Sequence, residues 1–184
     1  MTHDLGLAIE KVSHTRQLQQ DVPTILISTD ASFAPGGGKS RTGVVVLLDD
    51  MVVHWMTGRQ TRTSCSTCEA ELLASKTGLQ VGLNIRDVVA EATGQKVKVT
   101  MEGDNSAAIR TLQSEVTSWR TRHFAIDATW IRDIMKTEDI NISHRPGKEL
   151  IADGMTKLLH RVQLGDFRKN MALRDRFDQE DEQV

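Results

Sequence analysis

The chain is poor in cysteine and in aromatic residues. Its two cysteines, Cys65 and Cys68, are too few for a disulfide-stabilised scaffold, which favours a reducing compartment inside the cell. Tyrosine is absent and aromatic residues make up 4% of the sequence, so base stacking on an aromatic surface is not expected. No apolar run approaches the ~20 residues of a membrane-spanning helix, and the N-terminus lacks the pattern of a secretory signal. We therefore expect an intracellular protein, cytoplasmic or nuclear, with no membrane partner.

A strong net charge is also missing. The formal net charge is −2 at pH 7, unlike the basic balance of a stand-alone nucleic-acid-binding protein. Binding to nucleic acid would therefore need a local basic strip or the help of a neighbouring domain. The length of 184 residues, with 39% hydrophobic and 26% charged residues, fits one globular domain with extensions at its ends.

The hydrophobic pattern predicts an α/β domain with a mixed sheet. Three apolar or β-branched runs lie close together early in the chain and favour an antiparallel meander. A long helix follows, opened by a capping-box pattern at Ser66 and Glu69 and stopped by Gly94. The expected elements are a lead-in helix within 1–22, strands at 24–29, 42–48, 51–56, 97–104 and 140–143, and helices at 66–93, 107–112, 124–136 and 149–174. The predicted organisation is a lead-in or connection at 1–22, a domain at 23–160, and a helical extension with an acidic tail at 161–184.

Four carboxylates stand at predicted strand ends and helix starts. Asp30 and Asp104 end strands, whereas Glu71 and Asp153 lie in the second turns of helices. Clustered carboxylates repel one another, and two divalent cations would relieve that repulsion and support phosphoryl displacement. Mg²⁺ suits such a site because it prefers oxygen ligands. On spacing alone, solvated turns and caps explain the pattern at least as well, because the chain has 25 acidic residues.

Seven short blocks then point to a known family. In chain order they are STDASFA (28–34), VHW (53–55), RQ (59–60), STCEAEL (66–72), GDNSAAI (103–109), RHFAI (122–126) and IADGMTK (151–157). This ordered set, which covers roughly residues 24–160, resembles the RNase H domain of copia-type (LTR) retrotransposon polyproteins. The resemblance implies an RNase H-like fold, with a five-stranded mixed sheet flanked by helices and the three-strand antiparallel meander first. It also implies metal-dependent cleavage of the RNA strand of an RNA–DNA hybrid, leaving a 3′-hydroxyl and a 5′-phosphate.

Carried over residue by residue, the resemblance implies a catalytic and metal-binding set. Its members are Asp30, Glu71, Asp104 and Asp153, which would hold two Mg²⁺ ions, with Mn²⁺ as an alternative. The implied partners are the hybrid and a reverse transcriptase domain in the same polyprotein, and an active element would place the chain in a virus-like particle. Glu69 competes with Glu71 for the helical position, but its place in the capping box favours a structural role.

Further candidates surround this set. His144 is a catalytic candidate, because many RNase H enzymes carry a mobile histidine there; a surface histidine without a role is an equal alternative, since copia-type sequences often lack it. Asn105 follows Asp104 and is predicted to bond the 2′-hydroxyl that distinguishes RNA from DNA. The predicted phosphate contacts are Lys39, Arg41, Arg120 and Arg122. Arg120 and Arg122 lie beside Trp119 in a predicted loop, and an ordinary solvated loop is the alternative interpretation of that segment.

Other motifs are expected to carry no chemistry. The glycine-rich residues 36–40 lack the first glycine of a P-loop, and a strand follows them where a P-loop needs a helix. Cys65 and Cys68 have Cys-x-x-Cys spacing, but no thioredoxin-like strand pattern or second pair of zinc ligands accompanies them. Gly78 and Gly82, inside the long helix, are expected to permit close packing of that helix.

The sequence leaves three functions open. The first is an active RNase H, and the second is a catalytically silent or domesticated module that binds nucleic acid or a partner protein. The third is an integrase or transposase core that acts on DNA. The presence of all four carboxylates argues against simple decay. An aspartate at position 153, together with Glu71, favours RNase H over the Asp-Asp-Glu arrangement of integrases.

Overall fold

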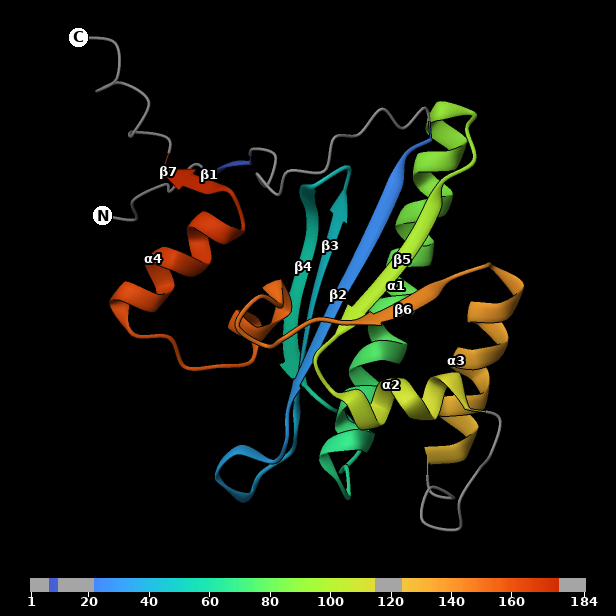
Figure 1. Ribbon diagram of the computed structural model, residues 1–184. Helices are drawn as coiled ribbons and strands as arrows, with labels where there is room; N and C mark the ends of the chain where they lie inside the picture. The colour runs from blue at the N-terminus through green and yellow to red at the C-terminus, as the bar shows by residue number, and fades with distance from the viewer. Residues whose placement is uncertain (1–6, 10–21, 115–123, 176–184) are drawn as a thin grey trace, which may run out of the picture.

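A five-stranded mixed sheet forms the centre of the protein (Figure 1). The computed structural model describes residues 7–9, 22–114 and 124–175. The strands of the sheet are β2 (Thr24–Ser32), β3 (Arg41–Leu48), β4 (Met51–Arg59), β5 (Lys98–Gly103) and β6 (Asn141–His144). They lie in the order β4-β3-β2-β5-β6, with β2, β3 and β4 antiparallel, β5 parallel to β2, and β6 parallel to β5. The predicted mixed sheet with an initial three-strand meander is therefore confirmed.

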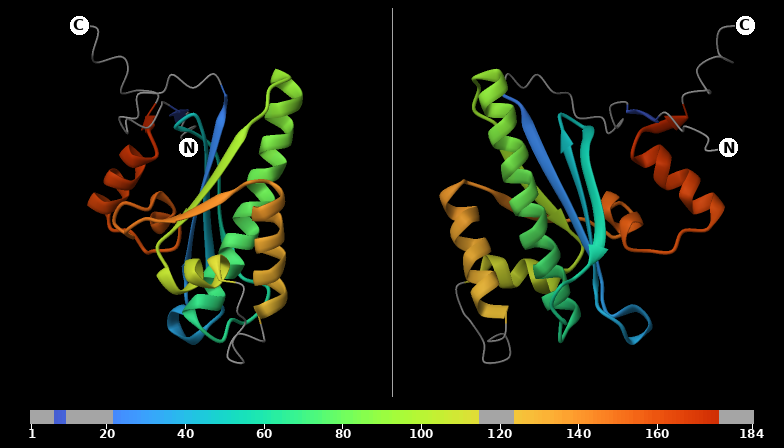
Figure 2. Two further views of the ribbon diagram at one scale, coloured as in Figure 1. Left: turned by 45° about the vertical axis from the view of Figure 1, so that its right-hand side comes forward. Right: turned by 180° about the vertical axis from the view of Figure 1, so that it is seen from behind.

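The two faces of the sheet are covered by different parts of the chain (Figure 2). The helices on one face are α1 (Thr67–Thr93), α2 (Ser106–Gln113) and α3 (Ala125–Thr137). The other face carries a 3-10 turn (Ile151–Met155) and helix α4 (Arg161–Asn170). As predicted, α1 ends at Gly94, whose φ of 66° is the left-handed conformation that glycine adopts without strain.

Close packing holds α1 against the sheet. Ile27 and Leu79 are fully buried between the two layers. A Cβ atom at Gly78 would lie 2.4 Å from Cγ2 of Thr29, and one at Gly82 would lie 2.2 Å from Cδ1 of Ile27. Any side chain at these positions would require Thr29, Ile27 or α1 itself to shift. The predicted packing role of both glycines is confirmed.

A third glycine brings the 3-10 turn onto the opposite face. Gly43 in β3 pairs with Asp30 in β2, and a Cβ atom there would lie 2.8 Å from Cβ of Met155 and 2.8 Å from Cγ2 of Thr156. Because position 43 has no side chain, the turn lies directly over the strand pair that carries Asp30.

The first and last described segments differ from the prediction. Residues 7–9, predicted within a lead-in helix, form strand β1 (Leu7–Ile9), which pairs antiparallel with β7 (Leu173–Asp175). The rest of the lead-in and the acidic tail lie outside the described residues. The single helix predicted for 149–174 is wrong, because this segment is divided into the 3-10 turn, α4 and β7. Gly154 contributes to the break: glycine disfavours a helix, and a Cβ atom there would lie 2.2 Å from Cδ2 of Phe167.

Candidate active site

Three aspartates from distant parts of the chain meet at one edge of the sheet. Asp104 directly follows β5, and Asp30 lies in β2, its parallel neighbour; the pairing of Ser28 with Glu102 places the two aspartates side by side. Asp153 comes from the 3-10 turn. One carboxylate oxygen from each aspartate lies within 4.8 Å of the others, a spacing that could hold a metal ion. The prediction that Asp30 ends its strand is wrong, because β2 continues to Ser32.

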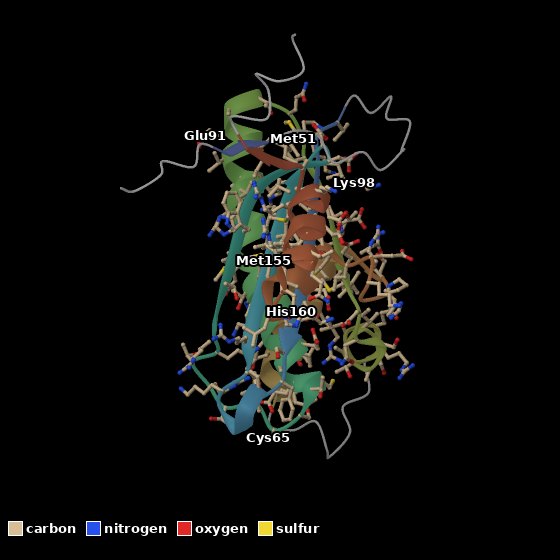
Figure 3. The ribbon with its side chains drawn as sticks, turned by 90° about the vertical axis from the view of Figure 1, so that its left-hand side faces the viewer. Met51, Cys65, Glu91, Lys98, Met155 and His160 are labelled. Carbon is tan, nitrogen blue, oxygen red and sulfur yellow. The ribbon has the colours of Figure 1, made fainter. Side chains whose placement is uncertain are left out.

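Hydrogen bonds to β2 and β4 hold the turn that supplies Asp153. The Thr156 hydroxyl donates to the carboxylate of Asp30, and the Thr57 hydroxyl donates to the Met155 carbonyl at 2.7 Å. In Figure 3, which faces this side of the sheet, Met155 lies near the middle of the molecule and Cys65 at its lower end. Thr156 was not predicted as an individual site residue; its only signal in the sequence is its place in the IADGMTK block.

Glu71 extends from α1 toward the aspartates. It is buried, and burial together with the charges of Asp30, Asp104 and Asp153 raises its pKa from 4.5 to about 9, against the opposing effect of a hydrogen bond from the Ala31 backbone. At neutral pH the metal-free protein therefore holds Glu71 in its protonated form.

Glu69, the competing glutamate, lies among capping groups. Its backbone N–H donates to the Ser66 hydroxyl at 3.2 Å, and its carboxylate accepts the Cys65 N–H at 2.7 Å. The capping-box pattern predicts that the Glu69 carboxylate accepts the backbone N–H of Ser66. It accepts the N–H of Cys65 instead, so the capping box is displaced by one residue. A distance of 3.8 Å separates the Glu69 carboxylate from the Arg62 guanidinium. These contacts give Glu69 a structural role at the start of α1.

The local electrostatics favour a bound cation. Burial raises the pKa of Asp30, and the charges of Asp104 and Asp153 raise it further, whereas Thr156 and Lys157 lower it. Like charges in a partly buried cluster oppose each other's ionisation, and a divalent cation removes that penalty. The donor set consists of carboxylate oxygens, which are the ligands that Mg²⁺ prefers. The residues therefore fit the divalent cation that the family resemblance implies.

Gly147, in the segment that follows β6, lies beside two of the aspartates. A Cβ atom there would lie 2.9 Å from Oδ2 of Asp104 and 3.7 Å from Oδ1 of Asp153. The sequence predicted only a turn at this position. The absence of a side chain leaves the space beside both carboxylates open to a ligand.

His144 and Asn105 lie next to Asp104 in the structure. The exposed ring of His144 donates a hydrogen bond from Nε2 to the Asp104 carbonyl at 2.9 Å. The side-chain oxygen of Asn105 accepts the backbone N–H groups of Ala107 and Ala108 at 3.0 and 2.9 Å, which caps α2. Capping occupies the amide oxygen of Asn105 and leaves its amide hydrogens to donate to a ligand.

A basic groove adjoins the turn. Its volume is about 580 Å³, and its basic lining residues are Lys39, Arg41, Arg59 and Lys157. Lys39 and Arg41 were predicted as phosphate contacts; Arg59 and Lys157 were not, because only the fold brings them to the same groove. Arg120, Arg122 and Trp119 lie outside the described residues. Cys65 and Cys68 belong to no metal-binding group within the part of the chain that the structure describes.

Solved structures of ribonucleases H share this architecture. LC11-RNase H1, isolated from compost by a metagenomic approach, matches with a TM-score of 0.59 at 18% identity, over 72% of this chain and 91% of that one. RNase H1 from the halophilic archaeon Halobacterium salinarum matches with a TM-score of 0.56 at 16% identity, over 78% and 98% of the two chains. The chain has the ribonuclease H-like fold. LC11-RNase H1 in complex with an RNA/DNA hybrid also matches this RNase H-like chain, with a TM-score of 0.56 at 17% identity over 71% and 92% of the two chains.

Sequence comparison adds a retrotransposon relative. No protein-family model matches the chain. The retrovirus-related Pol polyprotein from transposon TNT 1-94 of Nicotiana tabacum, a copia-type polyprotein, is 26% identical over 136 residues, or 72% of this chain. The RNase H-like chain spans 10% of the length of that polyprotein. The predicted resemblance to copia-type polyproteins is confirmed as a distant one.

No described helix is long and apolar enough to cross a membrane.

Proposed function

We propose that this chain is a metal-dependent ribonuclease H that hydrolyses the RNA strand of RNA–DNA hybrids, as in retrotransposon reverse transcription. The observation that carries the proposal is the meeting of Asp30, Asp104 and Asp153 within 4.8 Å, with Glu71 buried in their electrostatic field. The hybrid is the proposed substrate because a structurally similar enzyme, LC11-RNase H1, is known in complex with one. A reverse transcriptase domain of the same polyprotein is a proposed partner, because the related chain is a Pol polyprotein.

The proposed cofactor is a pair of Mg²⁺ ions, with Mn²⁺ as an alternative. Asp30, Glu71, Asp104 and Asp153 would hold them. Two divalent cations at such a site supply the activation of a water molecule and the stabilisation of the leaving oxygen in phosphoryl displacement. Thr156 orients the Asp30 carboxylate by its hydrogen bond, and outer groups of this kind set ligand geometry and basicity.

Neighbouring side chains would bind and position the substrate. Lys39 and Arg41 line the groove beside Thr156, where they would contact backbone phosphates without reading sequence. Asn105 would donate its amide hydrogens to a 2′-hydroxyl, the group that distinguishes RNA from DNA. His144 lies on the exposed edge next to Asp104, where it would assist proton transfer or product release.

The decisive experiment follows a hybrid with a label on its RNA strand in Mg²⁺ or Mn²⁺. Single-stranded RNA and duplex DNA serve as parallel substrates. The Asp104→Asn variant removes one charge from the cluster, and Asp133→Asn, at an exposed position on α3, is the matched control. We expect the RNA of the hybrid alone to be cleaved, with activity lost in Asp104→Asn and in chelator but kept in Asp133→Asn.

Two other results would reject the proposal. Cleavage of duplex DNA in place of the hybrid would indicate an integrase-like activity on the same fold. Measurable hybrid binding by a folded protein, with no cleavage at any concentration of either metal, would indicate a catalytically silent binding module.

A further inference from the structure

One lysine is in direct contact with the aspartate cluster. The ammonium nitrogen of Lys157 lies 2.5 Å from Oδ1 and 2.7 Å from Oδ2 of Asp153, four residues earlier in the chain. Its charge also acts on the rest of the cluster: it lowers the pKa of Asp30, while Asp153, Asp30 and Asp104 together raise the pKa of Lys157. Lys157 therefore supplies positive charge at a site whose carboxylates need a cation.

The same lysine lines the basic groove. Lys157 and Thr156 share that groove with Lys39, Arg41 and Arg59, and the groove begins where the 3-10 turn ends. The side chain of Lys157 is 58% exposed, so its ammonium can leave Asp153 without any change in the packing of the core. Because Lys157 already lines this groove, a released ammonium can join its other basic side chains.

We propose that Lys157 is an internal counter-ion that competes with a divalent metal for Asp153 and is displaced into the basic groove when the metal binds. The inference rests on the proposed metal site. In the metal-free chain, the lysine offsets repulsion among the carboxylates. When a metal occupies the site, the ammonium joins Lys39, Arg41 and Arg59, which adds a positive charge to the surface proposed to contact phosphates. Metal loading would thereby strengthen substrate binding.

Competition of this kind has a measurable consequence. A monovalent side-chain cation that must leave before the metal binds lowers the apparent metal affinity by the strength of its own ion pair. The pair of Lys157 and Asp153 is partly exposed, and such pairs are worth little in solvent. Removal of the charge should therefore tighten metal binding by about two- to fivefold, from the typical strength of exposed pairs.

The test is a titration of the whole chain with Mn²⁺, in which free Mn²⁺ is measured by electron paramagnetic resonance at neutral pH and constant ionic strength. The neutral variants are Lys157→Met and Lys157→Gln, and Lys157→Arg keeps the charge. Lys169→Met is the matched control, because it removes the same charge from an exposed position on α4. Thermal unfolding of each variant confirms that it is folded, and the two neutral variants provide independent routes to the same answer.

We expect both neutral variants to bind Mn²⁺ about two- to fivefold more tightly than the wild type, while Lys157→Arg and Lys169→Met stay close to it. Equal affinity in the neutral variants and in Lys169→Met would overturn the competition, as would weaker binding when the lysine is removed. Wild-type binding that is lost in Asp104→Asn would leave the proposed metal site intact in either case. No binding of Mn²⁺ by the wild type would overturn the metal site together with this inference.

Discussion

Replacement of Glu71 by glutamine should change how the stability of the metal-free protein depends on pH. Burial and the neighbouring aspartates raise the pKa of Glu71 from 4.5 to about 9, so between these values the folded state holds a proton that the unfolded state has released. The contribution of Glu71 to stability is therefore complete below pH 4.5 and is lost progressively as pH rises toward 9. At about 1.4 kcal/mol per pH unit, the loss amounts to about 4 kcal/mol between pH 5 and pH 8.

Glu71→Gln removes this proton equilibrium and keeps a side-chain oxygen that can accept from the Ala31 backbone. Urea unfolding of the wild type and the variant in chelator, at intervals from pH 5 to pH 8, measures the difference. The stability of the variant relative to the wild type should increase by about 4 kcal/mol across this range. In saturating Mg²⁺ the wild-type curve should flatten, because the cation offsets the ionised carboxylate. Parallel pH dependence of the two proteins in chelator would refute the reasoning, since it would mean that Glu71 ionises normally in the fold.

Two further substitutions test the support of the site and the packing of the fold. Thr156→Val removes the hydroxyl that donates to Asp30, so the pKa of Asp30 should rise and Mn²⁺ affinity should fall about 10- to 100-fold. Thr156→Ser keeps a hydroxyl and should restore the affinity. Unchanged Mn²⁺ affinity of Thr156→Val in a titration would exclude a role of Thr156 in orienting Asp30. Gly82→Ala places a methyl group 2.2 Å from Cδ1 of Ile27 and should reduce the free energy of unfolding by about 1–3 kcal/mol. Gly58→Ala is the control, because a Cβ atom there meets no atom within 4 Å, and it should not show this loss. Equal urea midpoints for the two variants would contradict the packing argument.

Local sequence signals predicted the elements that carry the site. The apolar run that ends near Asp30, the alternating residues that lead to Asp104, and the cap at Ser66 are short-range patterns, so they fixed β2, β5 and the start of α1 closely. The capping motif also assigned Glu69 to the helix start, and the structure places its contacts there, whereas the choice of Glu71 for the site rested on the family resemblance. The parallel pairing of β2 with β5, which these local patterns do not specify, then brings Asp30 and Asp104 together.

The segment after β6 shows where local signals fail. A helix predicted from residue 149 onward would have carried Asp153 in its second turn, but the chain there forms a 3-10 turn pressed against the sheet. The turn packs closely against Gly43 in β3, and nothing near Asp153 in the sequence records the contact. The strand at residues 7–9 is a similar case, because its partner lies at residues 173–175.

The sequence by itself determined the α/β class, the order of the strands along the chain, and the acidic residues available for a metal. These depend on hydrophobic period, capping and composition, which act over a few residues. Only the tertiary structure decided that Thr156 donates to Asp30, that Gly147 leaves room beside Asp104, and that Lys157 pairs with Asp153 at the edge of a basic groove. The contacts of Thr156 and Gly147 join distant parts of the chain, and the groove beside Lys157 gathers residues from several elements, so their geometry is set by how the layers pack against one another.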